Sequence, residues 1–351
     1  MDFLDNFLQK FTKDIAIDLG TANIRVFIKG ENKVLKEPCV VAINQNTGKV
    51  LAVGHEARKM IGRTPAHITA VQPLKSGVIS DFNATEALIY YFVEKVRPRL
   101  GMISQLLKPV VLIGVPSLIT EVEIKAVIDS AKSAGARKVF IVEEPLAAAI
   151  GSDLPIEDAV GNMIVDIGGG TTDIAVISMG GIVIDNTIKT AGDEMDLAIQ
   201  EYIRKKYNLL IGLKMAEDLK INLGSALPRK ESSSIAVKGQ DLLTGLPKSV
   251  EISSIEVTEA LEPVLDEILV AIKEAIERTP PEIVSDLILN GLYLAGGGAL
   301  IKDIDKFFSN KLKVKVNVSR DPIFSVSRGL SKILDNIELL NRVQFKDFIL
   351  R

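Results

Sequence analysis

The sequence predicts an α/β protein built from two related domains. Apolar strand-like runs alternate with helical segments along most of the 351 residues, which is the pattern of layered α/β folds. A strand–turn–strand motif at residues 14–28 (DIAIDLGTANIRVFI) recurs at residues 164–177 (IVDIGGGTTDIAVI). The two motifs align on Asp18 and Asp166, and such self-similarity indicates a duplicated domain.

The first half of the chain carries the alternation between its two hairpins. Pro116 ends one apolar run, and Gly135 follows a helical stretch as a typical C-terminal stop. The elements expected here are a helix at 86–96, a strand at 110–115, a helix at 120–134, a strand at 139–142 and an Ala-rich helix at 146–151.

The second half continues the pattern after its hairpin. Pro280 and Pro281 are expected to break the chain after a long helix. No low-complexity linker separates the halves, so the domains are expected to pack together. The expected elements are helices at 193–208 and 214–224, a strand-like stretch at 232–254, a helix at 256–277, a strand at 292–295 and a helix from about 301.

Composition excludes several classes of function. The chain is 47% hydrophobic and 25% charged with a net charge of −3, so it offers no basic face for nucleic acid. Cys39 is its single cysteine and it has two histidines, which excludes internal disulfides and disfavours a zinc site. These counts indicate a reducing cytosol.

The turns of the two hairpins have the chemistry of a phosphate site. Glycines allow a close backbone approach, and consecutive N–H groups form a nest for anions. Thr171 and Thr172 add hydroxyl donors that are suited to phosphate oxygens. An aspartate at each strand end would repel phosphate unless Mg²⁺ and its water shell lay between them. The alternative is a pair of ordinary glycine hairpins with turn-forming aspartates.

Two further stretches suggest a nucleotide. LAGGGAL (294–300) follows a strand and opens a helix, where a nucleotide could approach the backbone; the alternative is a tight strand–helix turn. It matches neither a Rossmann nor a P-loop pattern. Glu143 and Glu144 precede Pro145, where the helix dipole alone would favour acids.

Together these residues resemble the actin-like ATPase superfamily, and within it the MreB family of bacterial cytoskeletal proteins. The hairpins resemble its two phosphate loops, LAGGGAL its adenosine motif and VEEPLAAAIG its first connecting segment. More specific signatures follow in family order from residue 14 to 329: DLGTAN (18–23), EPCVVAI (37–43), IGRTP (61–65), PLKSGVISDF (73–82), AGDEMD (191–196), YIRKKYNLLIG (202–212) and TGLPK (244–248).

The resemblance implies an actin-like ATPase fold of two duplicated RNase H-like domains, each with a smaller subdomain, and a nucleotide cleft between them. The implied division is an amphipathic segment at 1–12, subdomain IA at 13–36, 73–150 and 322–351, subdomain IB at 37–72, subdomain IIA at 151–186 and 253–321, and subdomain IIB at 187–252.

The resemblance also implies ATP and Mg²⁺ as cofactors and assigns roles around the phosphates. Asp18 and Asp166 would hold Mg²⁺, largely through water. Glu144 would position or activate the attacking water, with Thr171 assisting. The phosphate contacts would come from Gly20, Thr21, Ala22 and Asn23 on one side and from Gly168, Gly169, Gly170 and Thr171 on the other.

Around the nucleoside, the implied contacts come from three motifs. Asp193 of AGDEMD matches an acid near the γ-phosphate. Glu217 and Lys220, three residues apart, could instead form an ordinary surface ion pair. The remaining matched positions are Ile221, Gly296, Gly297, Gly298 and Ala299.

Three departures from the family pattern stand out. Asp173 replaces the usual Glu, Ile24-Arg25 follows Asn23, and residues 321–334 keep only the outline of the family's last loop and helix. We expect nucleotide binding to survive these changes, whereas the hydrolysis rate does not follow from them.

The resemblance implies an ATPase that polymerises at the inner face of the cell membrane and contributes to cell shape. The implied partners are the chain itself in paired head-to-tail protofilaments, the lipid surface, and paralogues or membrane adaptor proteins. It would be cytoplasmic and peripheral. Two apolar segments are candidates for lipid contact, with core packing as the alternative: Phe3, Leu4, Phe7 and Leu8 in the first, and Leu100, Met102, Ile103, Leu106 and Leu107 in the second.

Three rival functions share this fold. A small-molecule kinase would need substrate-binding insertions in the first domain, and none is evident. A chaperone-type ATPase would need a substrate-binding domain, and none follows residue 351. A filament subunit that does not hydrolyse nucleotide is disfavoured because Glu144 and Thr171 are both present.

Overall fold

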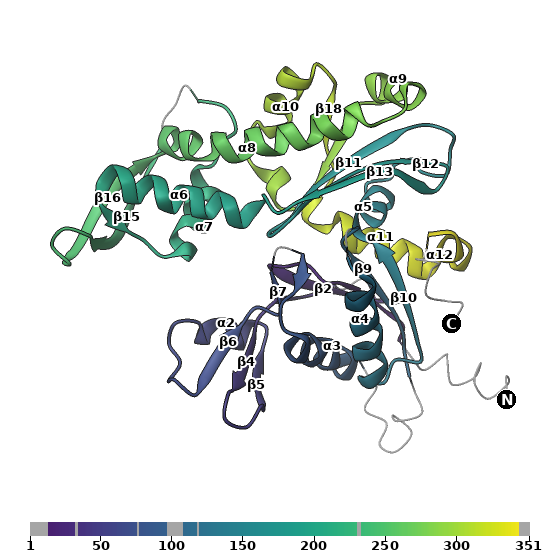
Figure 1. Cartoon of the computed structure of the whole chain (residues 1–351), viewed down its shortest axis with the longest axis horizontal. Coiled ribbons are helices and arrows are strands. Elements are labelled where there is room, and N and C mark those ends of the chain that lie inside the picture. Colours follow the sequence, from purple (N-terminus) through teal and green to yellow (C-terminus); the bar gives the residue numbers. More distant parts are fainter. Residues whose placement is uncertain are drawn as a thin grey trace. The chain divides into compact units, whose positions relative to one another are not determined.

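The computed structural model describes residues 13–31, 34–75, 77–96, 108–117, 119–229 and 233–343. These residues form two compact units, and the chain passes between them more than once (Figure 1). Unit 1 contains the described residues of Met1–Asp158, Met179–Gly181 and Phe324–Arg351, and unit 2 contains those of Ala159–Ser178 and Ile182–Ile323. Both lipid-contact candidates, at 1–12 and 100–107, lie outside the described residues.

A five-stranded sheet forms the centre of unit 1. Its order is β10-β9-β1-β2-β3. The strands β1, β2 and β3 pair antiparallel in sequence, whereas β9 pairs parallel to both β1 and β10. Their bounds are β1 (Ile15–Asp18), β2 (Asn23–Ile28), β3 (Val34–Pro38), β9 (Val110–Val115) and β10 (Lys138–Glu143).

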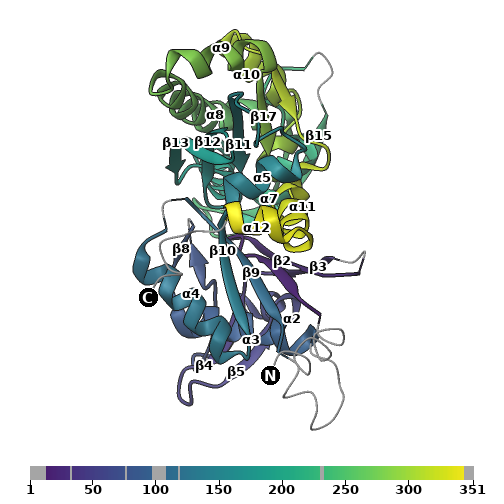
Figure 2. The ribbon, with the colours of Figure 1, turned by 90° about the vertical axis from the view of Figure 1, so that its right-hand side faces the viewer.

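Helices cover both faces of this sheet. Ile15 and Ile17 share a buried cluster with Phe92 of α3 (Phe82–Val96) and Val127 of α4 (Glu121–Ser133), and these helices lie side by side along the sheet (Figure 2). A capping box between Thr120 and Glu123 begins α4. The other face meets α5 (Glu144–Gly151) and α11 (Ser325–Asp335), and α12 (Ile337–Val343) follows.

Unit 1 also contains a small second sheet with its own hydrophobic core. Val40, Ala42 and Ala57 form that core. Cys39, just before it, is fully buried, and burial raises the pKa of its thiol to about 12. The elements here are β4 (Val41–Asn44), β5 (Val50–Val53), α2 (His55–Met60) and β6 (Ile68–Val71), followed by the short pair β7 (Leu74–Lys75) and β8 (Val78–Ile79).

Unit 2 repeats the sheet of unit 1. Its order is β13-β12-β11-β17-β18, with β11 antiparallel to β12 and parallel to β17. A strand hairpin extended by one strand on one side and by two parallel strands on the other is therefore present in both units. The bounds are β11 (Asn162–Ile167), β12 (Thr172–Ser178), β13 (Gly181–Ile188), β17 (Leu292–Ala295) and β18 (Val316–Val318).

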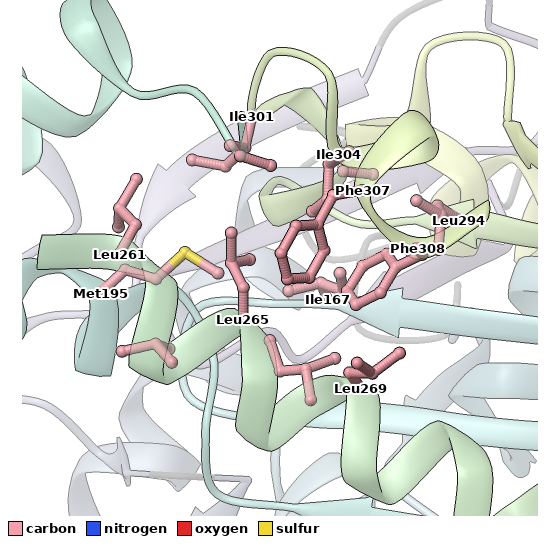
Figure 3. Close-up of a cluster of buried hydrophobic side chains, with 14 of the residues drawn as sticks. Ile167, Met195, Leu261, Leu265, Leu269, Leu294, Ile301, Ile304, Phe307 and Phe308 are labelled. Atoms are coloured by element: carbon pink, nitrogen blue, oxygen red, sulfur yellow. The ribbon is translucent and has the colours of Figure 1, made fainter. Parts of the chain in front are cut away.

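Leucine, isoleucine and phenylalanine side chains fill the core of unit 2 (Figure 3). Leu265 and Leu269 of the long helix α8 (Ser254–Glu277) pack in one cluster with Phe307 and Phe308 of α10 (Ile304–Leu312), whose rings meet edge to face at 5.3 Å. The remaining helical elements are α6 (Gly192–Tyr207), α7 (Leu213–Leu223), α9 (Pro281–Asn290), η2 (Gly298–Leu300) and η3 (Pro322–Phe324), the last spanning the boundary to unit 1.

A three-stranded sheet extends from unit 2. Its order is β14-β15-β16, and its strands are β14 (Leu209–Leu210), β15 (Ser234–Asp241) and β16 (Pro247–Ser253). The hairpin between β15 and β16 exposes three leucines: Leu242, Leu243 and Leu246. The capping box of Ser253 and Glu256 then starts α8 directly after β16.

The break expected at Pro280 and Pro281 is confirmed, because α8 ends at Glu277. A helix that the sequence analysis did not expect, α9, begins at Pro281, a position where the missing N–H is harmless and the fixed φ suits a helix. One expectation about the chain's course needs correction. Residues 151–158 belong to unit 1 rather than to the second domain, because Arg328 of α11 donates to Gly151 O at 2.8 Å.

Candidate functional site

The turn that follows Asp18, here called the first acidic turn (residues 19–22), joins β1 to β2 in unit 1. Asp18 ends β1 and Asn23 begins β2. A Cβ on Gly20 would lie 2.6 Å from the carbonyl oxygen of Asn23, so only glycine fits this turn. The turn is held by its neighbours, because Thr21 Oγ1 accepts from Gly77 N at 3.2 Å and Ala22 O accepts from Cys39 N at 3.1 Å.

Asp18 is a buried carboxylate with a cationic partner. Arg25 lies opposite it in the β1–β2 register and places Nη1 3.2 Å from Asp18 Oδ2. Burial raises the pKa of Asp18, and the charge of Arg25 opposes that rise. Arg25, which appeared only as a departure from the family pattern, thus partly compensates this desolvated acid.

Glu144 lies at the same edge of the sheet as Asp18. The three parallel strands end together here, since Asp18 pairs with Gly114 of β9 and Val115 pairs with Glu143 of β10. A Cβ on Gly114 would lie 3.0 Å from Leu330 Cδ1 and 3.5 Å from Glu144 Cγ, the second being an ordinary contact distance. Gly114 therefore leaves room mainly for Leu330 of α11, a role that sequence reasoning missed although the glycine interrupts an apolar strand.

The second acidic turn (residues 168–171) follows Asp166 and joins β11 to β12 in unit 2. It is closed by a hydrogen bond in which Gly168 N donates to Thr171 O at 2.9 Å. It is also joined to the start of α6. Gly192 N donates to Gly168 O at 3.2 Å, and Asp193 N donates to Gly169 O at 2.7 Å. These two N–H groups, which a helix N-terminus leaves without intrahelical partners, are therefore used by the turn.

The threonines of this turn differ in what they can offer a ligand. Thr172 is fully buried and donates its hydroxyl to Thr190 O at 2.7 Å. Its single hydroxyl proton is used, so the expectation that Thr172 donates to phosphate is wrong. Thr171, which is 8% exposed, donates its hydroxyl to the Asp173 carboxylate. Its proton is therefore also used, but its oxygen can still accept a hydrogen bond from a ligand.

Asp173 is buried opposite Asp166 in the β11–β12 register. Burial raises its pKa, and hydrogen bonds from Thr187 and Thr171 act against that rise. Thr187 Oγ1 donates at 2.7 Å. Asp173, the shorter acid found in place of the usual Glu, is thus held by hydrogen bonds from two threonines next to the turn.

Lys220 of α7 interacts mainly with other residues of the chain. Its Nζ donates to Gly192 O at 2.7 Å and lies 2.8 Å from Asp196 Oδ1. An ammonium group has three donors, so at least one remains for a ligand. Nearby on α7, Glu217 accepts from Lys214 at 2.9 Å, and Ile221 is exposed.

The glycines after β17 have separate roles. A Cβ on Gly296, at φ +80°, would lie 2.2 Å from Ile167 O and 2.3 Å from Asp166 Oδ1. A Cβ on Gly298 would lie 2.2 Å from Ile167 Cγ2. Gly297 alone has open space around it, and the side chain of Ala299 is buried in the core.

The carboxylates fit Mg²⁺ bound with phosphate rather than a metal centre made by protein alone. Within the described ranges, no group of three or more His, Cys, Asp or Glu side chains could hold a metal. Mg²⁺ characteristically takes one or two carboxylates and completes its shell with water and phosphate. Asp18, the last residue of β1, and Asp166, the last but one of β11, are both buried beside a glycine-containing turn, so their carboxylates have the chemistry of first contacts for such an ion.

Comparison with known proteins decides the family. A family model described as MreB/Mbl protein matches residues 12–342. The cell shape-determining protein Mbl of Bacillus cereus is 49% identical over 330 residues, covering 94% of this chain and 98% of that protein. The chain belongs to the MreB/Mbl family.

Solved structures agree with this MreB/Mbl assignment. MreB5 of Spiroplasma citri bound to ADP superimposes with a TM-score of 0.87 and 38% identity, covering 94% of this chain and 98% of that one. A MamK double helical filament has a TM-score of 0.78 at 23% identity over 93% and 99% of the two chains, a likeness of fold alone. The predicted actin-like fold is confirmed.

The structure distributes the expected residues of this MreB/Mbl-family chain over two half-sites. Unit 1 brings Asp18 and residues 20–23 to the strand edge that carries Glu144. Unit 2 gathers Asp166, residues 168–171, Asp193 and Lys220, and Gly296 contacts the same strand end. Asp196 was missed, because its importance depends on how α6 packs against α7.

Proposed function

We propose that the chain is a nucleotide-dependent, filament-forming member of the MreB/Mbl family that contributes to cell shape. It would bind ATP with Mg²⁺ through its two half-sites and hydrolyse it slowly. The observation that carries this proposal is the repeated half-site: each unit places an aspartate and a glycine-containing turn in the first hairpin of the same sheet topology.

Each half-site would contribute some of the groups needed for phosphoryl transfer, a reaction that depends on positioning and charge neutralisation. Backbone groups of residues 20–23 and 168–170 would contact phosphate oxygens. Asp18 and Asp166 would hold Mg²⁺ through water, and the bound ion would neutralise phosphate charge. Glu144 would orient the attacking water, and Thr171, already oriented by Asp173, would assist it. Gly297 would allow the nucleoside to approach the backbone.

Self-association is supported by two exposed apolar patches within unit 2. The first patch, the hairpin tip, comprises Leu242, Leu243 and Leu246, and the second comprises Ile288 and Leu289 at the end of α9. They lie toward opposite ends of the 24-residue helix α8 (Figure 1), which is roughly 36 Å long. A contact between two different patches does not close on itself and can propagate into a filament.

We expect the wild-type chain to sediment as polymer with Mg-ATP and to release phosphate. Leu243→Asp with Leu246→Asp, or Ile288→Asp with Leu289→Asp, should each abolish sedimentation, because a charge at either patch disfavours apolar burial. Val122→Asp, at an equally exposed valine of α4, is the matched control. The absence of polymer from wild type under any nucleotide condition contradicts the filament proposal.

Mixing the two double variants tests the head-to-tail arrangement. Each variant keeps one intact patch, so an equimolar mixture should form a 1:1 dimer in analytical ultracentrifugation and no longer species. If the mixture stays monomeric, or if either variant polymerises alone, the assignment of the two patches to one contact is wrong. Nucleotide binding, measured separately, is unaffected by that outcome.

We also propose that the filaments lie on the inner membrane surface. Among the helices in the described part of the chain, none combines the length and apolar character that a membrane crossing requires. Peripheral contact through an apolar segment is supported by the sequence pattern of Phe3, Leu4, Phe7 and Leu8.

Vesicle flotation compares the two lipid-contact candidates. Phe3→Ser with Phe7→Ser should reduce binding to phosphatidylglycerol vesicles at least about tenfold, since two buried aromatic rings are lost. Asp5→Asn, on the polar side of the same segment, should bind like wild type. Loss only in Leu106→Ser with Leu107→Ser would transfer the contact to residues 100–107.

A further inference from the structure

A chain of short contacts runs from α7 to the second acidic turn. Asp196 Oδ1 lies 2.8 Å from Lys220 Nζ, and Lys220 Nζ donates to Gly192 O at 2.7 Å. Gly192 N in turn donates to Gly168 O at 3.2 Å, and the next residue, Asp193, donates its N–H to Gly169 O at 2.7 Å. The Asp196–Lys220 ion pair therefore contacts residues at the start of α6 that in turn contact the turn expected to bind phosphate.

We propose that Asp196 is a positioning residue for nucleotide binding: it orients Lys220, and through Lys220 it holds the start of α6 against the turn at Gly168 and Gly169. The inference rests on the proposed nucleotide site. It gives Asp196 a function that neither its place inside a helix nor the motif AGDEMD predicts.

The donor inventory of Lys220 explains why the orientation matters. One of its three N–H groups donates to Gly192 O. The ammonium also lies 2.8 Å from Asp196 Oδ1 as an ion pair, although that oxygen accepts no hydrogen bond of acceptable geometry. Without Asp196, the ammonium would keep one protein partner and could rotate away from the turn. The N–H groups not bonded to Gly192 O, which are available for a phosphate or ribose oxygen, would then lose their fixed direction, and Gly192 O would lose a well-placed donor.

Burial makes the pair sensitive to the loss of either partner. The side chains of Asp196 and Lys220 are 12% and 15% exposed, so removing one charge leaves the other poorly solvated. A Cβ on Gly192 would lie 3.1 Å from Gly168 O and 3.4 Å from Lys220 Nζ. The lysine, the helix start and the turn therefore meet with little free space between them.

The charged groups around Asp196 are few. Lys220 and Glu217 face it from α7, and Asp193 faces it from its own helix. From α8, Glu256 and Glu259 face α6, but they hydrogen-bond to Tyr207 and Tyr202 toward its other end. Burial raises the pKa of Asp196 to about 6, against the attraction of Lys220 and with the repulsion of the two acids.

This geometry gives nucleotide affinity and folding stability opposite pH dependences. As the pH falls through about 6, Asp196 takes up a proton, its pair with Lys220 weakens, and nucleotide affinity should fall. The pKa of Asp196 in the folded state exceeds the 3.8 of an unperturbed aspartate, so the same protonation favours the folded state. A purely structural aspartate would not weaken nucleotide binding while its own contribution to stability rose.

The test measures the dissociation constant of a fluorescent ADP with Mg²⁺ from pH 5.5 to 8. At pH 7.5, Asp196→Asn should bind about tenfold more weakly than wild type, which corresponds to about 1.4 kcal/mol. The ratio between the two should fall to about threefold at pH 5.5, because roughly three quarters of wild-type Asp196 is neutral at half a pH unit below a pKa of about 6. Any titration of the nucleotide itself is common to both proteins and cancels in the ratio.

Glu201→Gln is the matched control, since Glu201 forms an exposed ion pair with Arg204 on the same helix; it should follow wild type at every pH. Equal affinity of Asp196→Asn and wild type, or a ratio independent of pH, would overturn the inference. If Asp196→Asn fails to fold, the same measurement is made on Asp196→Glu and on wild type. A wild-type nucleotide affinity that does not decrease as the pH is lowered below 6 also overturns the inference. A wild type that binds no ADP at any pH contradicts the proposed function itself.

Discussion

Replacing Glu144 by Gln should lower the rate of phosphate release by roughly 10²–10⁴-fold, the range over which general acid–base groups act. The side chain is 8% exposed and lies at the strand edge that also carries Asp18. The amide has nearly the same shape as the carboxylate but is a much weaker base for water. Single-turnover phosphate release with excess protein measures the step without interference from nucleotide exchange.

Two controls separate chemistry from binding and folding. The affinity of Glu144→Gln for a non-hydrolysable ATP analogue should stay within about threefold of wild type, a difference below 1 kcal/mol. Glu157→Gln, which changes an exposed carboxylate paired with Arg342 in the same unit, should hydrolyse at the wild-type rate. Wild-type phosphate release by Glu144→Gln would show that another group orients the water.

The second large effect is expected on stability, from Gly329→Ala. Alanine in a helix is normally preferred over glycine by about 1 kcal/mol. Here a Cβ would lie 1.8 Å from Ala147 O, and at the facing position a Cβ on Gly151 would lie 1.8 Å from Ser325 O. The backbones of α5 and α11 are thus in direct contact. We expect Gly329→Ala to destabilise unit 1 by about 3 kcal/mol or more, at or above the usual upper range of overpacking.

Urea unfolding with Gly212→Ala as the control checks the sign of this effect. A Cβ on Gly212 meets nothing within 4 Å, so that variant should change the free energy of unfolding by less than about 1 kcal/mol. An unchanged or increased stability of Gly329→Ala would mean that α5 and α11 separate at little cost. Because α5 begins with Glu144, weaker nucleotide hydrolysis should accompany the destabilisation.

Periodicity predicted the regular elements well because burial on one face determines them. The strand expected at 110–115 is β9 with the same bounds, and the helix expected at 256–277 is α8 with two additional residues at its start. Helix α9 was missed because Pro281 was read only as a helix breaker, although proline is also favoured as the first residue of a helix. The duplicated hairpins predicted the two half-sites because both the acid and the glycine turn were repeated.

Side-chain partners set by tertiary packing were beyond sequence reasoning. The Asp18–Arg25 pair follows from a hairpin register and could have been found from the turn length. The Lys220–Asp196 pair joins two helices, and the inability of Thr172 to donate further depends on a carbonyl 18 residues away. Only the three-dimensional arrangement distinguishes Thr172 from Thr171.

The burial of Cys39 gives unit 1 a chemical reporter of its own opening. The thiol is fully buried, its pKa is raised to about 12, and it is the single cysteine of the chain. Alkylating reagents react with an exposed thiolate, so labelling requires a transient opening that exposes this residue. Under fast reclosing, the labelling rate measures the open population of unit 1 alone, while unit 2 contributes no signal to the same experiment.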